Sequence, residues 1–284
     1  MLIDTFPKFI DYWNTVQNKS VDEQIEGWAN DYMSSWPELL EKQIADYAEQ
    51  NLDWKEIARE KVFPYICERL PAMQEARENL VALCPTIYFK AQETLGFEET
   101  ISFVIYVGIG CGAGWVTPYD TKPAILFGLE NIAESGWSTV EAIKGLIAHE
   151  TGHVVHFHWR EENELTLGDD EWWQLYSEGF AQRCESLLNG ANSWHEETTN
   201  AGWLEWCRNH KSWLANEFLM TVAAGQPVNR FFGSWHEIEG KKQTGYYLGH
   251  EVVRELEKEY SLKAIALLDD IPTYLKRTLE HIGN

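Results

Sequence analysis

The sequence predicts an α+β fold that is mostly helical, with one small sheet near the middle of its 284 residues. Apolar residues recur at helical spacing from residue 10 to 82 and again after Ser138, with acidic residues between them. Residues 101–108 and 123–129 are instead short β-branched and apolar runs bounded by glycine or proline, which is typical of strands. We therefore expect a small sheet with a helix packed on it and a helical C-terminal half.

The prolines and the change in texture suggest two regions. Pro64, Pro71 and Pro85 are expected to interrupt the N-terminal helices, because proline lacks the backbone N–H that a helix interior needs. An N-terminal helical region, residues 1–85, should then be followed by a second domain, residues 86–284. Within that domain we expect a sheet in residues 86–135 and helices in residues 138–190 and 195–284.

The connection between the two predicted strands is rich in glycine. Gly108, Gly110 and Ala113 match the relaxed dinucleotide-binding pattern G-x-G-x-x-A. That pattern requires a helix to begin at once, so that its N-terminus can hold the pyrophosphate, whereas Pro118 blocks a helix here. A flexible turn between strands is the better interpretation.

Composition argues against several classes of partner. The net charge of −22 disfavours nucleic acid and anionic lipid, both of which attract basic surfaces. No long apolar window and no N-terminal signal pattern occurs, so neither a membrane span nor secretion is expected. The five cysteines are odd in number and widely spaced, which favours reduced thiols in a cytoplasmic protein.

A helix that carries a buried acid is predicted after the sheet. Ser138 and Glu141 match the capping box S-x-x-E, so the helix should begin there. Its apolar face contains Glu150, and a buried carboxylate is costly unless another group compensates it. The apolar residues of that face are Ile143, Leu146, Ile147, Val154 and Phe157.

Two histidines on the same helix have the spacing of metal ligands. His149 and His153 lie one turn apart and form H-E-x-x-H with Glu150, in which the glutamate acts as general base. Ordinary polar residues on a core helix are the alternative. His156 and His158 lack this spacing, and the longer zinc motif would need glycine at position 156, so we interpret both as supporting or surface residues.

A catalytic zinc site needs a third protein ligand, and an acid downstream is the natural candidate. Glu178 is flanked on both sides by apolar residues, and an acid in such surroundings requires a partner. Glu185 is also available. Three earlier acids are expected in a loop or helix cap: Asp169, Asp170 and Glu171.

The segments "LIAHETGH" and "LYSEGFAQRCE" together resemble the gluzincin metallopeptidases, the thermolysin-like superfamily that includes the zinc aminopeptidases. The aminopeptidase branch has a second motif N-E-G-F-A and another glutamate seven residues after the ligand. Residues 177–181 and Glu185 match it, apart from Ser177. The resemblance implies a thermolysin-like catalytic domain with one zinc ion per chain. It assigns the ligands to His149, His153 and Glu178, and the general base to Glu150.

A third segment, "TGYYLGHEVVREL", is similar to the part of those enzymes in which a tyrosine of Y-x-x-G stabilises the oxyanion. The resemblance implies this role for Tyr246, with Tyr247 or His236 as substitutes. A tyrosine in the core is the alternative interpretation.

The chain also departs from the family pattern. The gap between His153 and Glu178 is longer, which suggests an inserted loop at residues 160–171. The strand motif that binds a substrate's free amino group is present only as the shortened "GLEN", where Glu130 would be the amine anchor. Aminopeptidase specificity therefore does not follow, and the N-terminal helical region matches no family.

These observations favour a zinc metallopeptidase that acts on a peptide or protein substrate. Glu150 would take a proton from the attacking water and pass it to the leaving amine. The strand at residues 123–129 could pair with an extended peptide if it lies at an edge of the sheet. A zinc-binding regulatory module without turnover, and a hydrolase of non-peptide amides, are the alternatives.

Overall fold

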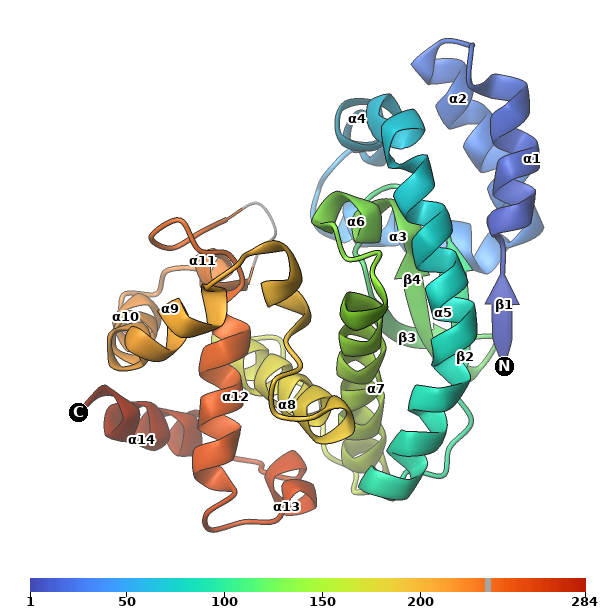
Figure 1. Ribbon diagram of the computed structural model, residues 1–284. Coiled ribbons are helices and arrows are strands. Elements are labelled where there is room, and N and C mark those ends of the chain that lie inside the picture. The colour runs from blue at the N-terminus through green and yellow to red at the C-terminus, as the bar shows by residue number, and fades with distance from the viewer. Residues whose placement is uncertain (233–235) are drawn as a thin grey trace. The chain divides into compact units, whose positions relative to one another are not determined.

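The computed structural model describes residues 1–232 and 236–284, without the side chain of Thr198. The chain divides into two compact units, residues 1–89 with 98–147 and residues 90–97 with 148–284. Most elements are helices and there is one four-stranded sheet, so the predicted α+β class is confirmed (Figure 1). Residue 85 lies within a long helix, so the predicted boundary does not coincide with the end of an element.

The first unit contains the sheet and the N-terminal helices. Its strands are β1 (Leu2–Asp4), β2 (Ser102–Tyr106), β3 (Trp115–Tyr119) and β4 (Lys122–Gly128). Its helices are α1 (Phe6–Val16), α2 (Val21–Gly27), α3 (Pro37–Glu49), α4 (Trp54–Ile57), most of α5 (Ile66–Leu95), α6 (Leu129–Ser135) and the start of α7 (Val140–Glu162). Short helical turns of other pitch follow α2 and α4: η1 (Trp28–Tyr32), η2 (Met33–Ser35), η3 (Ala58–Val62) and η4 (Phe63–Tyr65).

Helix α5 continues through two prolines. The predicted interruptions at Pro71 and Pro85 are therefore wrong, whereas Pro64 does lie in a separate turn before the helix. A proline in a helix interior costs about 3 kcal/mol, because one hydrogen bond is lost and the ring crowds a carbonyl. Burial of one face along α5 offsets this cost. The buried residues of that face include Met73, Ala76, Leu80, Cys84 and Ile87.

The sheet has the strand order β1-β2-β4-β3. Strand β2 pairs in parallel with β1 and β4, and β3 pairs antiparallel with β4. Strands β2 and β4 confirm the two predicted strands. The sequence did not predict β1, which has only three residues, or β3, which contains Pro118 within the glycine-rich connection. Because β4 lies inside the sheet with both sides paired, the expectation that it is a free edge strand is wrong.

The glycine-rich connection is organised by one buried acid. The backbone N–H groups of Gly108 and Gly110 donate to the two carboxylate oxygens of Glu130, at 2.7 and 3.1 Å. Gly110 has φ +98°, a conformation that favours glycine. No helix follows the connection, as Pro118 predicted. Both oxygens of Glu130 already accept backbone hydrogen bonds, which gives this acid a structural role in the connection, and its expected role as an anchor for a substrate amine stays a prediction.

Helix α7 begins one residue later than the capping box predicted. Ser138 donates its hydroxyl to Glu75 at 2.6 Å, and Thr139 instead accepts a hydrogen bond from the backbone of Ala142 at 3.3 Å. The predicted role of Ser138 as the cap is therefore wrong, because another helix of the unit offers its hydroxyl a carboxylate. The hydroxyl of Thr139 satisfies a free N–H in its place.

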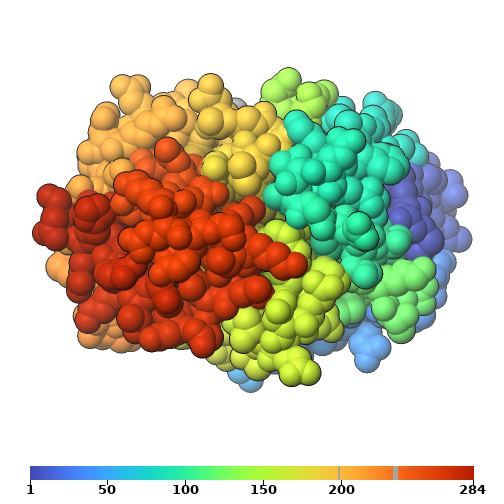
Figure 2. Space-filling view, turned by 90° about the horizontal axis from the view of Figure 1, so that it is seen from below, coloured from blue at the N-terminus to red at the C-terminus, as the bar shows by residue number. Residues whose placement is uncertain are grey.

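The second unit is helical. It contains the rest of α7, then α8 (Glu171–Asn189), η5 (His195–Thr199), α9 (Trp203–Asn209), α10 (Lys211–Ala223), α11 (Asn229–Phe232), α12 (Thr244–Leu256), α13 (Leu262–Ala266) and α14 (Ile271–Gly283). Helix α12 packs on α8 and α14, and the C-terminal helices form one continuous surface, orange to red in Figure 2. None of the described helices combines the length and apolar character that crossing a bilayer requires.

Candidate metal centre

Glycines bring the three motif-bearing helices of the second unit close together. A Cβ atom on Gly152 of α7 would lie 2.9 Å from the Cα of Ala181 on α8. A Cβ atom on Gly179 of α8 would lie 2.3 Å from the carbonyl carbon of Gly249 on α12. Real side chains do not tolerate such distances, so each crossing requires glycine. The glycines of "HETGH", "SEGFA" and "YYLG" therefore set the spacing of the site.

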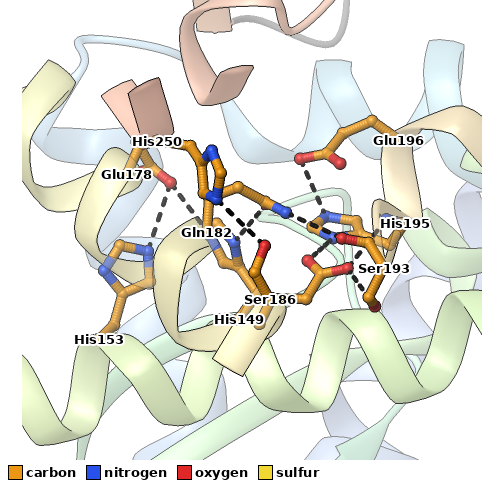
Figure 3. Close-up of polar contacts among 10 residues, drawn as sticks. His149, His153, Glu178, Gln182, Ser186, Ser193, His195, Glu196 and His250 are labelled. Carbon is orange, nitrogen blue, oxygen red and sulfur yellow. Dashed lines mark hydrogen bonds and ion pairs between the residues drawn. The ribbon is translucent and has the colours of Figure 1, made fainter. Parts of the chain in front are cut away.

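The close crossing of α7 and α8 places the three predicted ligands together (Figure 3). One carboxylate oxygen of Glu178 lies 3.1 Å from Nε2 of His149 and 3.3 Å from Nε2 of His153. Ligand atoms about 2.0–2.2 Å from a tetrahedral zinc ion lie roughly 3.4 Å apart. Two imidazoles and one carboxylate are also a donor set that zinc prefers. The three residues therefore fit a metal ion in both spacing and chemistry.

The charges of these groups depend on one another. Burial alone would raise the pKa of Glu178, but the charges and hydrogen bonds of His153 and His149 hold it well below its usual range. Burial would lower the pKa of His149, but the bond and charge of Glu178 raise it to about 9. A metal ion binds the same atoms only after the imidazoles lose their protons. The centre is thus arranged to stabilise positive charge.

Two polar side chains of α8 orient the histidine rings through contacts with their Nδ1 atoms. Nδ1 of His149 lies 3.2 Å from Oε1 of Gln182, whose amide nitrogen donates to the carbonyl of Ser193. This arrangement lets Nδ1–H donate to Gln182 and leaves the lone pair of Nε2 facing Glu178. The hydroxyl of Ser177 contacts Nδ1 of His153 at 3.2 Å. The serine that departs from the family motif therefore still supports a ligand.

Glu150 lies beside the ligands as a buried acid. It is 8% exposed, and none of the side-chain hydrogen bonds among the described residues involves its carboxylate. Burial raises the pKa of this carboxyl, and the neighbouring His153 and His149 partly oppose the shift. A carboxylate with a raised pKa and no fixed donor is suited to accept and return a proton.

Tyr246 is the tyrosine that reaches the centre. Its half-buried ring lies 5.4 Å from the ring of His149. Burial raises the pKa of Tyr246 well above its usual value, and the charges of nearby carboxylates add to the effect, so its hydroxyl remains a neutral donor. Tyr247 packs against Trp194 and Trp203 instead, with ring centroids 5.8 and 6.5 Å apart. The other substitute, His236, is exposed.

A second group of possible ligands, His149 with Glu185 and His195, adjoins the first. Glu185 is fully buried and contacts Nδ1 of His195 at 2.7 Å, the backbone N–H of His195 at 3.1 Å and the hydroxyl of Ser193 at 2.8 Å. Both groups need His149. Because Nδ1 of His149 faces Gln182 and Nε2 faces Glu178, the first group is the better metal site, and Glu185 with His195 forms a hydrogen-bonded support beside it.

The remaining predicted residues lie away from the ligands. His156 is fully buried among the rings of Trp173, Tyr176 and Phe180, so it is a core residue and not a surface one. His158 is half-buried on the same helix and lies 3.5 Å from Glu162. Neither belongs to a group of possible metal ligands among the residues that the structure describes, in agreement with their spacing. The acids before α8 include its cap, since Asp170 accepts from the backbone N–H of Trp173 at 2.7 Å.

Sequence reasoning missed Gln182, His195 and Glu196, which all lie near His149. Gln182 could have been found from its position four residues after Glu178, on the same face of α8. His195 and Glu196 belong to the segment after α8, where no periodic pattern places them.

No known family model matches the chain, and neither a curated protein nor a solved structure shows significant similarity to it. The resemblance to gluzincins therefore depends on the sequence motifs alone.

Proposed function

We propose that the protein is a zinc-dependent metallopeptidase. The observation that carries the proposal is that Nε2 of His149 and Nε2 of His153 lie 3.1 and 3.3 Å from the same oxygen of Glu178, next to the buried Glu150. A protein that only binds zinc needs the three ligands, but it has no use for a costly buried acid next to them. The position of Glu150 thus favours turnover over a purely structural metal.

The residues around the centre supply complementary roles. Zinc held by His149, His153 and Glu178 would act as a Lewis acid that lowers the pKa of water toward neutrality. Glu150 accepts a proton from the attacking water and returns it to the leaving amine. Tyr246, kept neutral by its raised pKa, donates its hydroxyl to the oxyanion that develops on the carbonyl.

Cleavage of a mixed peptide library, read by mass spectrometry, tests the proposal. Purified protein should contain about one zinc ion per chain and should cleave library peptides. Glu150→Gln should keep the metal and lose about 10²–10⁴-fold in rate, the usual contribution of a general base. Glu162→Gln, on the same helix but about one turn past His158, is the matched control and should cleave normally.

Four results would contradict the proposal in different ways. A protein that takes up no zinc lacks the metal centre. A zinc-loaded protein that cleaves no peptide but hydrolyses small amides is a hydrolase of another class. A zinc-loaded protein without either activity is a binding module, and unchanged turnover in Glu150→Gln would remove the role of the base.

A further inference from the structure

Glu196 is a buried carboxylate without a hydrogen-bond donor. It lies in η5, is 3% exposed, and neither of its oxygens receives a hydrogen bond from the residues that the structure describes. The nearest charged partner is Nε2 of His195, 3.7 Å from one oxygen. Buried carboxylates are costly when they lack donors, so native proteins rarely keep one without a ligand or a function for it.

The charges around Glu196 are unbalanced. His195 stands between two buried acids, with Nδ1 on Glu185 and Nε2 toward Glu196. Glu185 already has three hydrogen bonds. The charge of His149 also acts on both acids, but His149 is paired with Glu178, and the imidazole of His195, even when protonated, neutralises only one of the two carboxylates. Burial accordingly raises the pKa of Glu196 to about 7. The cluster therefore favours an additional positive charge.

Glu196 lies near the candidate metal centre. In Figure 3 its carboxylate is directed at His195, whose ring lies beside that of the ligand His149. The negative charges of Glu178, Glu196 and Glu150 all raise the pKa of the Tyr246 hydroxyl, so Glu196 shares this neighbour with the metal centre. The ring of His195 lies 5.2 Å from the ring of His149, so η5 borders the ligands. A group bound to Glu196 would thus lie within reach of a peptide held at the metal.

We propose that Glu196 binds the positively charged side chain of a lysine or arginine close to the scissile bond of the substrate. This inference depends on the proposed peptidase function. An ammonium carries three N–H donors and a guanidinium five, so either one can bond both free oxygens of Glu196. The added charge also balances the second carboxylate of the cluster.

A side chain fits this position better than the amino terminus of a substrate. The α-nitrogen of the residue being cleaved lies about 2.5 Å from its own carbonyl carbon, which has to approach the metal ligands. Glu196 is separated from the ligand His149 by the imidazole of His195. The long flexible stem of lysine or arginine can span this ring, whereas the α-amino group cannot.

Matched peptides test the inference in the wild-type protein. A cleaved library peptide is resynthesised with arginine or its neutral isostere citrulline, and with lysine or norleucine, at each position next to the cut. At one position the basic peptide should have a kcat/KM at least tenfold higher than its neutral partner. Glu196→Gln should bring this ratio close to one, and Glu197→Gln, a change at the neighbouring half-buried acid, should leave the ratio as it is.

Binding gives a second readout that does not depend on turnover. Isothermal titration of the Glu150→Gln protein with the same peptides should show at least tenfold tighter binding of the arginine peptide than of the citrulline peptide. In the double variant with Glu150→Gln and Glu196→Gln, the two peptides should bind equally tightly. Measurements of zinc content and thermal unfolding check that this double variant is folded.

The outcomes separate the two proposals. Cleavage without any preference for basic residues would overturn the role of Glu196 and leave the peptidase function standing. If no peptide is cleaved, the proposed function fails. The titration then uses arginine and citrulline versions of a library peptide that binds the Glu150→Gln protein, and equal binding overturns the inference as well. Dependence of cleavage on a free amino terminus is the remaining outcome. If acetylation of the amino terminus lowers kcat/KM whereas the change from arginine to citrulline does not, Glu196 binds the α-amino group and the side-chain assignment is refuted.

Discussion

Glu130 in the first unit and Glu178 in the second are both acids in motif-like segments, yet their partners differ. The carboxylate of Glu130 accepts hydrogen bonds from two backbone amides and is 1% exposed. The carboxylate of Glu178 contacts two imidazole nitrogens. Burial raises the pKa of Glu130 to about 7 despite its amides, whereas the histidines hold the pKa of Glu178 well below its usual range.

The difference shows that burial alone does not distinguish a structural acid from a functional one. Neutral amides orient a carboxylate and fix the loop that supplies them, but they bring no group that could hold an ion. Imidazoles offer lone pairs that converge with the carboxylate on one point. The chemistry of the partners therefore decides the role.

Removing the acid of the second unit should have the largest effect. Glu178→Ala should lower zinc affinity on the order of 10³-fold, because a binding free energy of about 10–16 kcal/mol is shared among few ligands. Glu171→Ala, at the start of the same helix, should change affinity little. Competition with a chromophoric chelator measures both. Equal losses would mean that Glu178 is not the third ligand.

Changing the acid of the first unit should affect stability and not metal binding. The pKa of Glu130 is about 7 in the folded protein and 4.5 as the reference for the unfolded chain. The folded state therefore binds the extra proton between these values, and the stability due to Glu130 is present below pH 4.5 and lost as the pH rises toward 7. The loss corresponds to about 3 kcal/mol.

Urea unfolding at pH 4.5 and pH 7.5 measures this effect. Glu130→Gln cannot titrate, so the stability of the wild type relative to this variant should fall between the two pH values, while zinc affinity stays unchanged. A constant difference would show that the amides of Gly108 and Gly110 compensate burial fully.

A smaller effect on zinc affinity is expected from Gln182, which contacts the ring of the ligand His149. Gln182→Ala removes the acceptor of Nδ1 of His149 and should weaken zinc binding about tenfold, the lower end for such supporting residues. Gln174→Ala, half-buried on the same helix, is the control. If Gln182→Ala binds zinc as tightly as the control, the orientation of His149 does not depend on this bond.

The parts of the molecule that follow from local spacing were predictable. His149, Glu150 and His153 lie within one helix, so their mutual geometry depends only on helical periodicity. Strands β2 and β4 are short apolar runs, and their existence followed from composition. Glu178 was identified because its apolar neighbours left it without a local partner.

The parts that depend on tertiary contacts were not predictable. Strand β1 exists because it pairs with β2 nearly a hundred residues later. The hydroxyl of Ser138 donates to Glu75, a residue of another helix, and therefore does not cap α7. The segment of Glu130 resembled an amine anchor, but in the fold its carboxylate accepts hydrogen bonds from two backbone amides of the glycine-rich connection. His195 and Glu196 reach the centre through the irregular segment after α8, which carries no sequence pattern.

The residence time of an ion at this centre is tied to the packing of α7 on α8. The ligands come from both helices, which meet where Gly152 lies against Ala181 without room for a side chain. Separation of the two helices would pull the histidines away from Glu178 and would expose buried surface of the second unit. Metal exchange should therefore be slow and should speed up under conditions that open this helix pair. The glycine that allows the helices to meet would thus also affect how long an ion bound at these residues is retained.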